Sequence, residues 1–575
     1  MPSVAIPSRR MASLQWIGKE AVVGHHREVP YHLLRGDPAL SVGEDGGVGS
    51  GNLLVQGDNL LALKALLPYY AGRVKCIYID PPYNTGNEGW VYNDNTNSPE
   101  IRQWIGKVVG KEGETLDRHD RWLCMMYPRL ALLKEFLTED GAIFVSIDDT
   151  EFAMLRLMMD EVFGHRNYLG TLVWKSRTSS AMRGTPLSVD HEYVGVYGKD
   201  IANTRLYGLA KGADGYPHAD DRGRYASTDL TIGMTSRERP GQFYTITNPR
   251  TGTQYPANPE RVWRFFPETM DGVIAKGLVI WPDEAEGRMT RPRYKTYWDP
   301  KSEKPLPLTS WVESASANQP RMSESEAEGD DETGRVVLTA ALTQEGGRVL
   351  SEIFGTKSFA YPKPPSLLQS IVRCGSGPND LIMDSFAGSG TTGHAVLAMN
   401  KADGGNRRFI CIEMDSTIAT TITAQRLRKV AEGYHPQGDA KKEKVQGTGG
   451  GFRYVTLGEP LFDERGRLRD AVKFADLAAH VFFTETGEPI PKKVNGKRSP
   501  LIGTCRGIAY YLLFNGILGD KRPDGGNVLT GDVLAELPKH DGPRVVFGEA
   551  CRLGAARLKR EGVTFRQIPY QIKVS

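Results

Sequence analysis

The stretch Val74-Lys75-Cys76-Ile77-Tyr78-Ile79-Asp80-Pro81-Pro82-Tyr83 decides the fold prediction for this chain. Its first six residues are mostly apolar, which is typical of a short strand buried in a parallel sheet. Asp80 follows at the carboxyl end of that strand, and this is the edge at which open α/β sheets bind their ligands. The sequence therefore predicts an α/β fold with a site at Asp80.

The residues after the strand suit the binding of an amino group on a flat ring. Proline has a fixed φ and no N–H, so the strand ladder ends here and the Pro81 carbonyl is free to accept a hydrogen bond. The Asp80 carboxylate is a second acceptor, and the Tyr83 ring can stack on a base. An exocyclic amine that donates both of its hydrogens becomes more pyramidal and more nucleophilic. A proline-rich turn capped by Asp also occurs in ordinary structures, so a purely structural role stays open.

A second strand, turn and helix pattern lies far along the chain. Leu381–Asp384 is another apolar run, and a glycine-rich segment over 385–392 separates it from a helical pattern over 393–399. Gly388 and Gly390 permit a tight turn and the close approach of a ligand, while the helix start offers unpaired N–H groups. The spacing matches neither the phosphate loop nor the full dinucleotide fingerprint.

A third apolar run, Arg408–Ile412, ends at Glu413. A carboxylate at this position can bind the two hydroxyls of a ribose. An ordinary tight turn beside a surface acid would give the same pattern. The turn and the acid together favour a nucleoside-type cofactor.

On these residues the chain resembles the S-adenosylmethionine-dependent amino-methyltransferases of DNA, in the class where D-P-P-Y precedes the glycine block. Residues 386–390 match the family's F-x-G-x-G. By the resemblance, Asp58 contacts the adenine amino group of the cofactor, and the segment at Lys363 closes over its methionine part. The resemblance implies a catalytic set and a cofactor-binding set: Asp80, Pro81, Pro82 and Tyr83, and Asp58, Lys363, Asp384, Phe386, Ala387, Gly388, Ser389, Gly390, Thr391 and Glu413.

Within that class the chain is most similar to the modification (Mod) subunit of Type III restriction systems. The similarity includes Trp16–Glu20, the D-P-P-Y-N-T-G form, and the segments Asp476–Thr484 and Phe565–Tyr570. It implies methyl transfer to N6 of a flipped adenine in double-stranded DNA, a homodimer, and a separate helicase-nuclease restriction subunit. It also implies a cytoplasmic, nucleoid-associated protein encoded by a bacterium or a phage. His25 and His26 are interpreted as paired surface histidines rather than ligands.

The predicted architecture is a Rossmann-like, mostly parallel methyltransferase sheet built from two segments. A helix over 120–137, a strand over 141–147, a helix capped by Asp149 or Thr150 that runs to Phe163, and a strand from Leu172 are expected. A helix over 549–560 is expected near the C-terminus. The predicted parts are an N-terminal arm (1–50), catalytic segment one (51–165), an irregular target-recognition insertion (166–346), cofactor-binding segment two (347–432), a flexible linker (433–451) and a small α/β domain for dimer or partner docking (452–575).

Arginine, glycine and aromatic residues interleave in the insertion. Arginine and lysine neutralise phosphates, and planar side chains can fill the space that an extruded base leaves. A solvated basic face explains the same composition equally well, and the family order favours target recognition. The acidic run 324–332 is expected to form a mobile loop away from DNA, and Lys441, Lys442 and Lys444 to belong to a solvated tether. The candidate DNA-binding residues are Arg222, Arg224, Arg264, Arg291, Arg293 and Lys295.

Composition excludes several other classes. The 575 residues are 39% hydrophobic and contain no long apolar run, which argues against a membrane span, and no signal peptide is legible. The six cysteines lack C-x-x-C spacing, so a metal site is not expected. A net charge of +3 requires any phosphate-binding surface to be local. No phosphate loop ending in Lys-Ser/Thr is present, so translocation on DNA would need another subunit.

Four alternatives remain open or are disfavoured. Cytosine N4 is also an amine, and adenine is favoured only because Asp rather than Ser opens the block. A catalytically silent DNA-specificity module is a rival from another class. Methylation of protein glutamine or of adenine in RNA uses a similar P-P-Y block. Cytosine-C5 chemistry is disfavoured because none of the cysteines follows a proline.

Overall fold

The computed structural model describes residues 14–85, 106, 117–178, 187–207, 217–284, 289–297, 308–314, 336–437, 443–463, 465–491, 499–517 and 519–568. The chain divides into two compact units. One comprises Met1–Tyr207, Ser310–Ala317 and Leu338–Ser575, and the other comprises Gly208–Thr309 and Asn318–Val337. The acidic run 324–332 lies outside the described residues.

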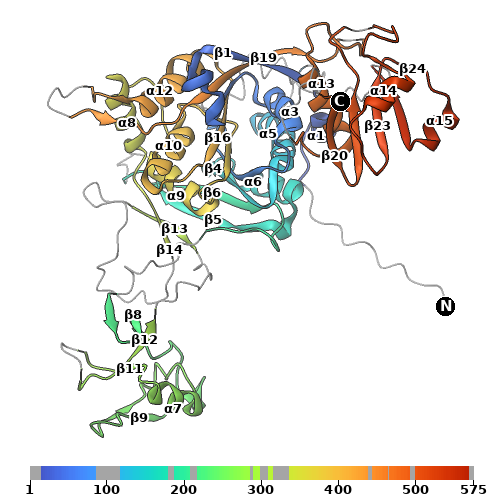
Figure 1. Cartoon of the computed structure of the whole chain (residues 1–575). Coiled ribbons are helices and arrows are strands. Elements are labelled where there is room, and N and C mark those ends of the chain that lie inside the picture. Colours follow the sequence, from blue (N-terminus) through green and yellow to red (C-terminus); the bar gives the residue numbers. More distant parts are fainter. Residues whose placement is uncertain are drawn as a thin grey trace, which may run out of the picture. The chain divides into compact units, whose positions relative to one another are not determined.

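An 11-stranded mixed sheet forms the centre of the first unit (Figure 1). Its central strands, from β19 to β4, run parallel; β1 is antiparallel to β19, and β6 is antiparallel to both β4 and β5. The strands in spatial order are β1 (His32–Val42), β19 (Phe452–Pro460), β2 (Leu53–Gln56), β16 (Arg408–Glu413), β15 (Leu381–Asp384), β3 (Val74–Ile79), β4 (Leu137–Ile147), β6 (His191–Gly198), β5 (Tyr168–Lys175), β13 (Leu308–Ser314) and β14 (Val336–Ala340).

Helices cover both faces of the central strands (Figure 1). On β3, Ile77 lies in one core cluster with the apolar residues of α3 (Asn59–Tyr70), α5 (Arg118–Phe136) and α6 (Phe152–Met159). The neighbouring Cys76 points to the other face, where a Cβ on Gly375 would lie 2.7 Å from its Sγ. Gly375 ends α9 (Pro365–Gly375), which packs beside α10 (Thr391–Asp403). This alternation of strand side chains explains why both faces of the sheet are covered.

Five more helices belong to the first unit. They include the turns near the start of the described chain and those that follow the glycine block. Their bounds are α1 (Lys19–Val23), α2 (His25–Glu28), α8 (Gln344–Phe354), α11 (Ser416–Ile418) and α12 (Ala424–Glu432). Among the described residues, none of the helices is long and apolar enough to cross a membrane.

A small α/β layer follows β19. Its four-stranded sheet has the order β20 (Leu501–Cys505), β21 (Ile508–Leu512), β23 (Arg544–Gly548) and β25 (Val563–Gln567). Helices α13 (Phe474–Thr486), α14 (Gly531–Glu536) and α15 (Ala555–Arg560) accompany it. The predicted helix over 549–560 is wrong in its first half, because β24 (Ala550–Cys551) pairs with β22 (Val528–Leu529) there.

The second unit has its own core. Trp263, Met270 and Trp281 are buried in it beneath a four-stranded antiparallel sheet. That sheet has the order β11 (Val279–Ile280), β12 (Arg293–Tyr297), β8 (Gly223–Asp229) and β7 (His218–Asp220), and the unit adds the hairpin of β9 (Thr245–Thr247) and β10 (Gln254–Pro256) and helix α7 (Pro267–Ala275).

The domain boundaries predicted from sequence need correction. The main sheet uses β1 from the predicted N-terminal arm, β19 from the predicted C-terminal domain, and four strands from the predicted insertion, rather than two segments alone. The prediction of a mostly parallel sheet fits its centre but not its edges. Strand β6 shows the reason for the error: it is buried and apolar in its second half, but it lies among Gly- and Arg-rich residues that resemble an irregular domain.

Three local predictions also need correction. The described part of the predicted flexible linker forms two short paired strands, β17 (Gly433–Tyr434) and β18 (Val445–Gln446), with Lys444 exposed beside them. A Cβ on the following Gly447 would lie 2.4 Å from the Ala431 carbonyl, so this segment is packed against α12. Lys441 and Lys442 lie outside the described residues.

The helix α6 is capped one residue later than predicted. Glu151, rather than Asp149 or Thr150, is its N-cap, and a π-helical turn over Asp160–Gly164 carries it past Phe163. His26 is 9% exposed, so the interpretation of paired surface histidines is wrong for this residue, and His25 is half-buried. Burial, with help from the nearby Arg27 and Lys64, lowers the pKa of His26 to about 4.

Candidate active site

Two stretches of the sequence leave neighbouring strands at the same edge of the sheet. They are residues 80–83, here called the catalytic block, and residues 385–392, here called the glycine block. Strand β15 pairs in parallel with β3, with Ile382 opposite Cys76 and Met383 opposite Ile77. Because carboxyl ends of parallel strands meet at one edge, Asp80 and the glycine block that begins after Asp384 emerge side by side. The structure thus brings together residues about 300 positions apart in the sequence.

Lys363 and Glu192 surround the Asp80 carboxylate. The Nζ of Lys363 lies 2.9 Å from Oδ1 of Asp80 and 3.4 Å from Oε2 of Glu192 on β6. The Tyr83 hydroxyl donates to the same Glu192 oxygen at 2.9 Å. Lys363 also lies over the Tyr83 ring, 4.6 Å from its centroid. One ammonium is therefore shared between two carboxylates beside the aromatic ring of the catalytic block.

Burial and charge act against each other in this cluster. Burial raises the pKa of Asp80, and the attraction of Lys363 offsets part of that rise. For Lys363, burial opposes the charged form, but Asp80 and Glu192 outweigh it and raise the pKa of the ammonium. Burial also raises the pKa of Tyr83. Lys363 consequently remains a cation, and its side chain is only 9% exposed.

The loop after Pro82 is fastened to two helices. The Pro82 carbonyl accepts a hydrogen bond from Trp122 Nε1 at 2.6 Å. Asn84 has a positive φ of 58°, and its Nδ2 donates to Glu151 Oε1 at 2.5 Å and to the Arg118 carbonyl at 3.1 Å. Pro81 is buried. These contacts fix the direction in which the loop leaves β3.

Buried acids brace the glycine block. Both oxygens of Glu413 accept backbone N–H groups at 2.8 Å, from Gly388 and from Asp415. Glu413 is 1% exposed, and burial raises its pKa to about 8. Asp384 accepts from the Phe386 N–H at 3.0 Å and from the Thr392 hydroxyl, and burial raises its pKa to about 7. In this structure Glu413 holds the turn; contact with a ribose stays a prediction.

The backbone of the glycine block forms a tight turn before α10. Gly388 and Gly390 have φ of 52° and 79°, which favour glycine. The Ala387 N–H donates to the Ile412 carbonyl, and the N-terminus of α10 begins directly after the turn. The Thr391 hydroxyl donates to the Lys363 backbone carbonyl at 3.3 Å. Lys363 therefore touches the glycine block with its main chain and Asp80 with its side chain.

Arg426, on α12, holds two side chains of the glycine block by hydrogen bonds. Its Nη1 donates to Ser389 Oγ at 2.9 Å and to Thr391 Oγ1 at 2.8 Å. The side chain is completely buried, and burial lowers its pKa to about 9. Sequence reasoning missed Arg426, because an arginine in an amphipathic helix pattern such as α12 resembles a surface residue.

Asp58 lies at the start of α3. Its carboxylate accepts from the N–H groups of Leu60 and Leu61 and pairs with Arg129 at 3.1 Å, while its side chain is 35% exposed. The next residue, Asn59, donates to the Ser385 carbonyl at 3.1 Å. Asp58 is thus an N-cap linked through its neighbour to the glycine block. Its contact with a cofactor remains a prediction.

Two further carboxylates of the site were missed as well. Glu192 belongs to a segment assigned to the insertion, and Glu151 follows two acidic residues that resemble a surface turn. The only sequence signal for Glu192 was its place at the start of an alternating, partly apolar run. The described residues contain no group of three or more His, Cys, Asp or Glu side chains suited to a metal ion.

The candidate DNA-binding residues lie in the second unit. Arg222, Arg224, Arg264 and Arg291 are exposed. Arg293 donates to Ser227 Oγ at 2.8 Å, and Lys295 pairs with Asp220 at 2.8 Å. Strand alternation places Arg293 and Lys295 on one face and Arg224 on the other. The six residues therefore do not share one strand face.

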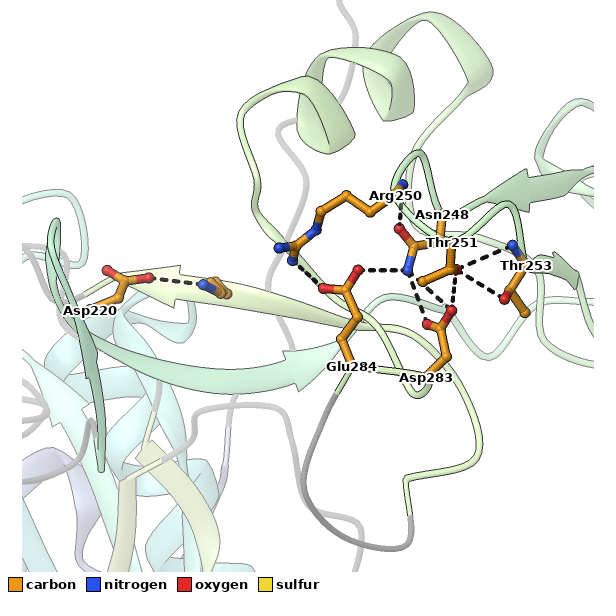
Figure 2. Close-up of polar contacts among 8 residues, drawn as sticks. Asp220, Asn248, Arg250, Thr251, Thr253, Asp283 and Glu284 are labelled. Atoms are coloured by element: carbon orange, nitrogen blue, oxygen red, sulfur yellow. Dashed lines mark hydrogen bonds and ion pairs between the residues drawn. The ribbon is translucent and has the colours of Figure 1, made fainter.

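A separate polar network holds the hairpin of the same unit (Figure 2). Asn248 donates to Asp283 at 3.0 Å and to Glu284 at 2.9 Å. Arg250 pairs with Glu284, and Thr251 donates to Asp283. Arg250 pairs with one of the two acids, the other accepts neutral donors, and together these contacts fix the turn between β9 and β10.

The comparisons with known proteins agree with this geometry. Residues 74–424 match the family model described as DNA methylase. The chain belongs to the N6/N4 DNA methylase family. Its members are S-adenosylmethionine-dependent methyltransferases. Both blocks and the inserted unit lie inside the matched range.

Type III Mod subunits are among the relatives of this family member. The StyLTI Mod subunit of Salmonella typhimurium is 31% identical over 69% of this chain and 56% of its own length. The EcoPI Mod subunit of Escherichia phage P1 is 31% identical over 76% of this chain and 68% of its own length. The chain thus spans between half and about 70% of these relatives.

Structural similarity is weaker. The solved PvuII DNA methyltransferase (cytosine-N4-specific) is 13% identical, with a TM-score of 0.32, over 68% of this chain and 88% of that one. At this TM-score the similarity says nothing about the target base.

Proposed function

We propose that this DNA methyltransferase transfers a methyl group from S-adenosylmethionine to N6 of an adenine that has rotated out of duplex DNA. We also propose that it is the modification and recognition subunit of a Type III restriction-modification system. The observation that carries the proposal is the pairing of β15 with β3, since it brings the glycine block and Asp80 to one edge of the sheet.

The residues of the glycine block are proposed to hold the cofactor. Gly388 and Gly390 give the turn its left-handed backbone, and hydrogen bonds from Arg426 and to Glu413 fix its shape. Asp58, Asp384 and Phe386 would line the same site. When bound, S-adenosylmethionine supplies a methyl group that moves from sulfur to nitrogen as the C–S bond breaks and its electron pair stays on sulfur.

The residues after β3 are proposed to hold the target amine. A base inside a duplex cannot present its amine to the cofactor, so it must rotate out, and the Tyr83 ring offers a stacking surface. Asp80 and the Pro81 carbonyl would accept the two amine hydrogens. The nitrogen then loses one proton, for which the partly desolvated Asp80 carboxylate is the nearest acceptor in this scheme. Positioning and charge complementarity supply the catalysis.

Mass spectrometry tests the target base. Unmethylated duplex DNA is incubated with the protein and S-adenosylmethionine and then digested to nucleosides. N6-methyladenine is the expected product, and N4-methylcytosine alone would refute the choice of adenine. Equal labelling of RNA or protein in the presence of DNA would refute the substrate class.

The Asp80→Ala variant tests the catalytic assignment. It removes the acceptor at the end of β3, so methylation should fall by at least about 100-fold, the usual loss when a group that positions the reacting atom is removed. Binding of S-adenosylmethionine, measured by calorimetry, should change little. Full turnover by this variant with radiolabelled S-adenosylmethionine would contradict the assignment.

Assembly is proposed from the Mod relatives, and DNA contacts are proposed from the exposed arginines of the second unit. The relatives named above are Type III enzyme subunits, which supports a separate restriction subunit as partner. A homodimer is proposed, and light scattering after size-exclusion chromatography tests it. A monomer at all concentrations would refute self-association.

A further inference from the structure

Glu192 is a carboxylate of the site to which the proposed methyl transfer gives no role. It lies on β6, and its side chain is 19% exposed. One oxygen, Oε2, receives both the Tyr83 hydroxyl at 2.9 Å and the ammonium of Lys363 at 3.4 Å. It therefore contacts Tyr83, a member of the catalytic set, and Lys363, which pairs with Asp80.

The proposed reaction creates competition for one oxygen of Asp80, Oδ1. The carboxylate must accept a hydrogen bond from the target amine, but Lys363 already lies 2.9 Å from its Oδ1. A buried ammonium that loses its partner is left with a large desolvation cost. An arriving amine can therefore take this position only if Lys363 finds another acceptor close by.

Glu192 is that acceptor by position. A charge-assisted N–H···O contact is about 2.7–2.9 Å long, so Lys363 needs to move by only roughly half an ångström to reach Oε2. A long, unbranched lysine side chain makes such a move by small torsional changes. No backbone shift is required.

We propose that Glu192 is a positioning residue that receives the Lys363 ammonium when a target amine takes its place at Asp80. The inference rests on the proposed function, because it needs an amine that binds to Asp80. It adds a specific order of events: the amine enters, Lys363 moves onto Glu192, and Asp80 is left as an acceptor in contact with the substrate.

The same move prepares Asp80 for the proton that the amine must lose. Lys363 lowers the proton affinity of Asp80 and Glu192 raises it, so a lysine drawn onto Glu192 makes the carboxylate more basic. The other ionisable groups near Asp80 are the phenols of Tyr78 and Tyr83, which are neutral, and the acid Asp384, whose protonated form is favoured by burial. The groups that face Asp80 are Lys363, Glu192, Tyr83, Tyr78 and Asp384.

Two substitutions separate this role from simple support of Tyr83. Glu192→Gln removes the negative charge but keeps an oxygen that can accept from the Tyr83 hydroxyl. Tyr83→Phe keeps the ring and the charge of Glu192 but removes the hydroxyl. If Glu192 only held the ring, both variants would lose activity in the same way.

The test measures kcat and KM for DNA from pH 5 to 9 in the full-length wild type and both variants, with saturating S-adenosylmethionine. For Glu192→Gln we expect kcat/KM to fall about tenfold or more at neutral pH. In the proposed scheme the acid limb of the plot of kcat/KM against pH reports the deprotonation of Asp80. Because Lys363 stays on Asp80 in Glu192→Gln, this limb should move to lower pH. In Tyr83→Phe that limb should stay or move to higher pH, since the hydroxyl lowers the pKa of Asp80.

Calorimetry with S-adenosylmethionine shows whether each variant is folded, and unchanged affinity is expected for both. An unshifted acid limb in Glu192→Gln, or the same shift in both variants, would overturn the role of Glu192. Loss of cofactor binding together with activity would overturn it too, since Glu192 would then be structural. A wild type that methylates no DNA would instead refute the proposed function itself.

Discussion

Arg426 provides the most direct test of how the glycine block is held. The Arg426→Met variant keeps most of the side-chain volume but removes the guanidinium, which donates to Ser389 and Thr391. Hydrogen bonds from a charged donor contribute about 1.5–3 kcal/mol each, but removal also relieves the desolvation of a buried charge. Because the lost hydrogen bonds outweigh the relieved desolvation, the ordered conformation of the glycine block should be less stable by about 2 kcal/mol.

If the ordered block is the state that binds the cofactor, this loss appears in the affinity for S-adenosylmethionine. About 2 kcal/mol corresponds to a roughly 30-fold higher Kd. Isothermal titration calorimetry measures the Kd, and a thermal melt reports the fold. Arg426→Lys is the matched control, because it keeps the charge but reaches fewer acceptors, and an intermediate Kd is expected. A Kd for Arg426→Met within twofold of the wild type would refute the reasoning.

Two further predictions concern the same site. The pKa of Glu413 is about 8 in the folded chain and near 4.5 when unfolded, so the folded state keeps a proton that the unfolded state loses. The free energy of unfolding should therefore fall as pH rises from about 4.5 to 8; Glu413→Gln should flatten this dependence in urea titrations, and an unchanged slope would contradict the assignment. Asn84→Ala should lower stability by about 1–2 kcal/mol and reduce methylation, because alanine is strained at φ 58° and leaves Glu151 without the amide donor. Asn84→Gly relieves the strain alone, so a Gly variant as impaired as the Ala variant would assign the whole effect to the lost hydrogen bond.

Local chemistry made the centre of the fold predictable. The strand before Asp80 and the strand before Ser385 are short and almost wholly apolar, and each ends in a residue pattern that stops a strand. The helix over 120–137 was predictable because its apolar residues recur at helical spacing, and α5 spans nearly the same residues. These features depend on neighbours in the sequence.

The edges of the sheet were not predictable for the opposite reason. Strand β19 joins β1 and β2 across about 400 residues, and its own sequence does not reveal those partners. Glu192 and Arg426 matter only because the fold brings them to residues far away in the chain. Their sequence surroundings resemble an irregular segment and an exposed helix face, so a single sequence carries little signal for either.

The way in which the second unit is inserted has a consequence for specificity. The chain leaves the main sheet after β6 and returns at β13, so the insertion interrupts neither β3 nor β15. Replacement of residues 208–309 by the equivalent stretch of a relative would leave the strands under Asp80 and the glycine block undisturbed. If the second unit selects the target sequence, chimaeras of this kind should keep the chemistry and exchange only the DNA sequence that is modified.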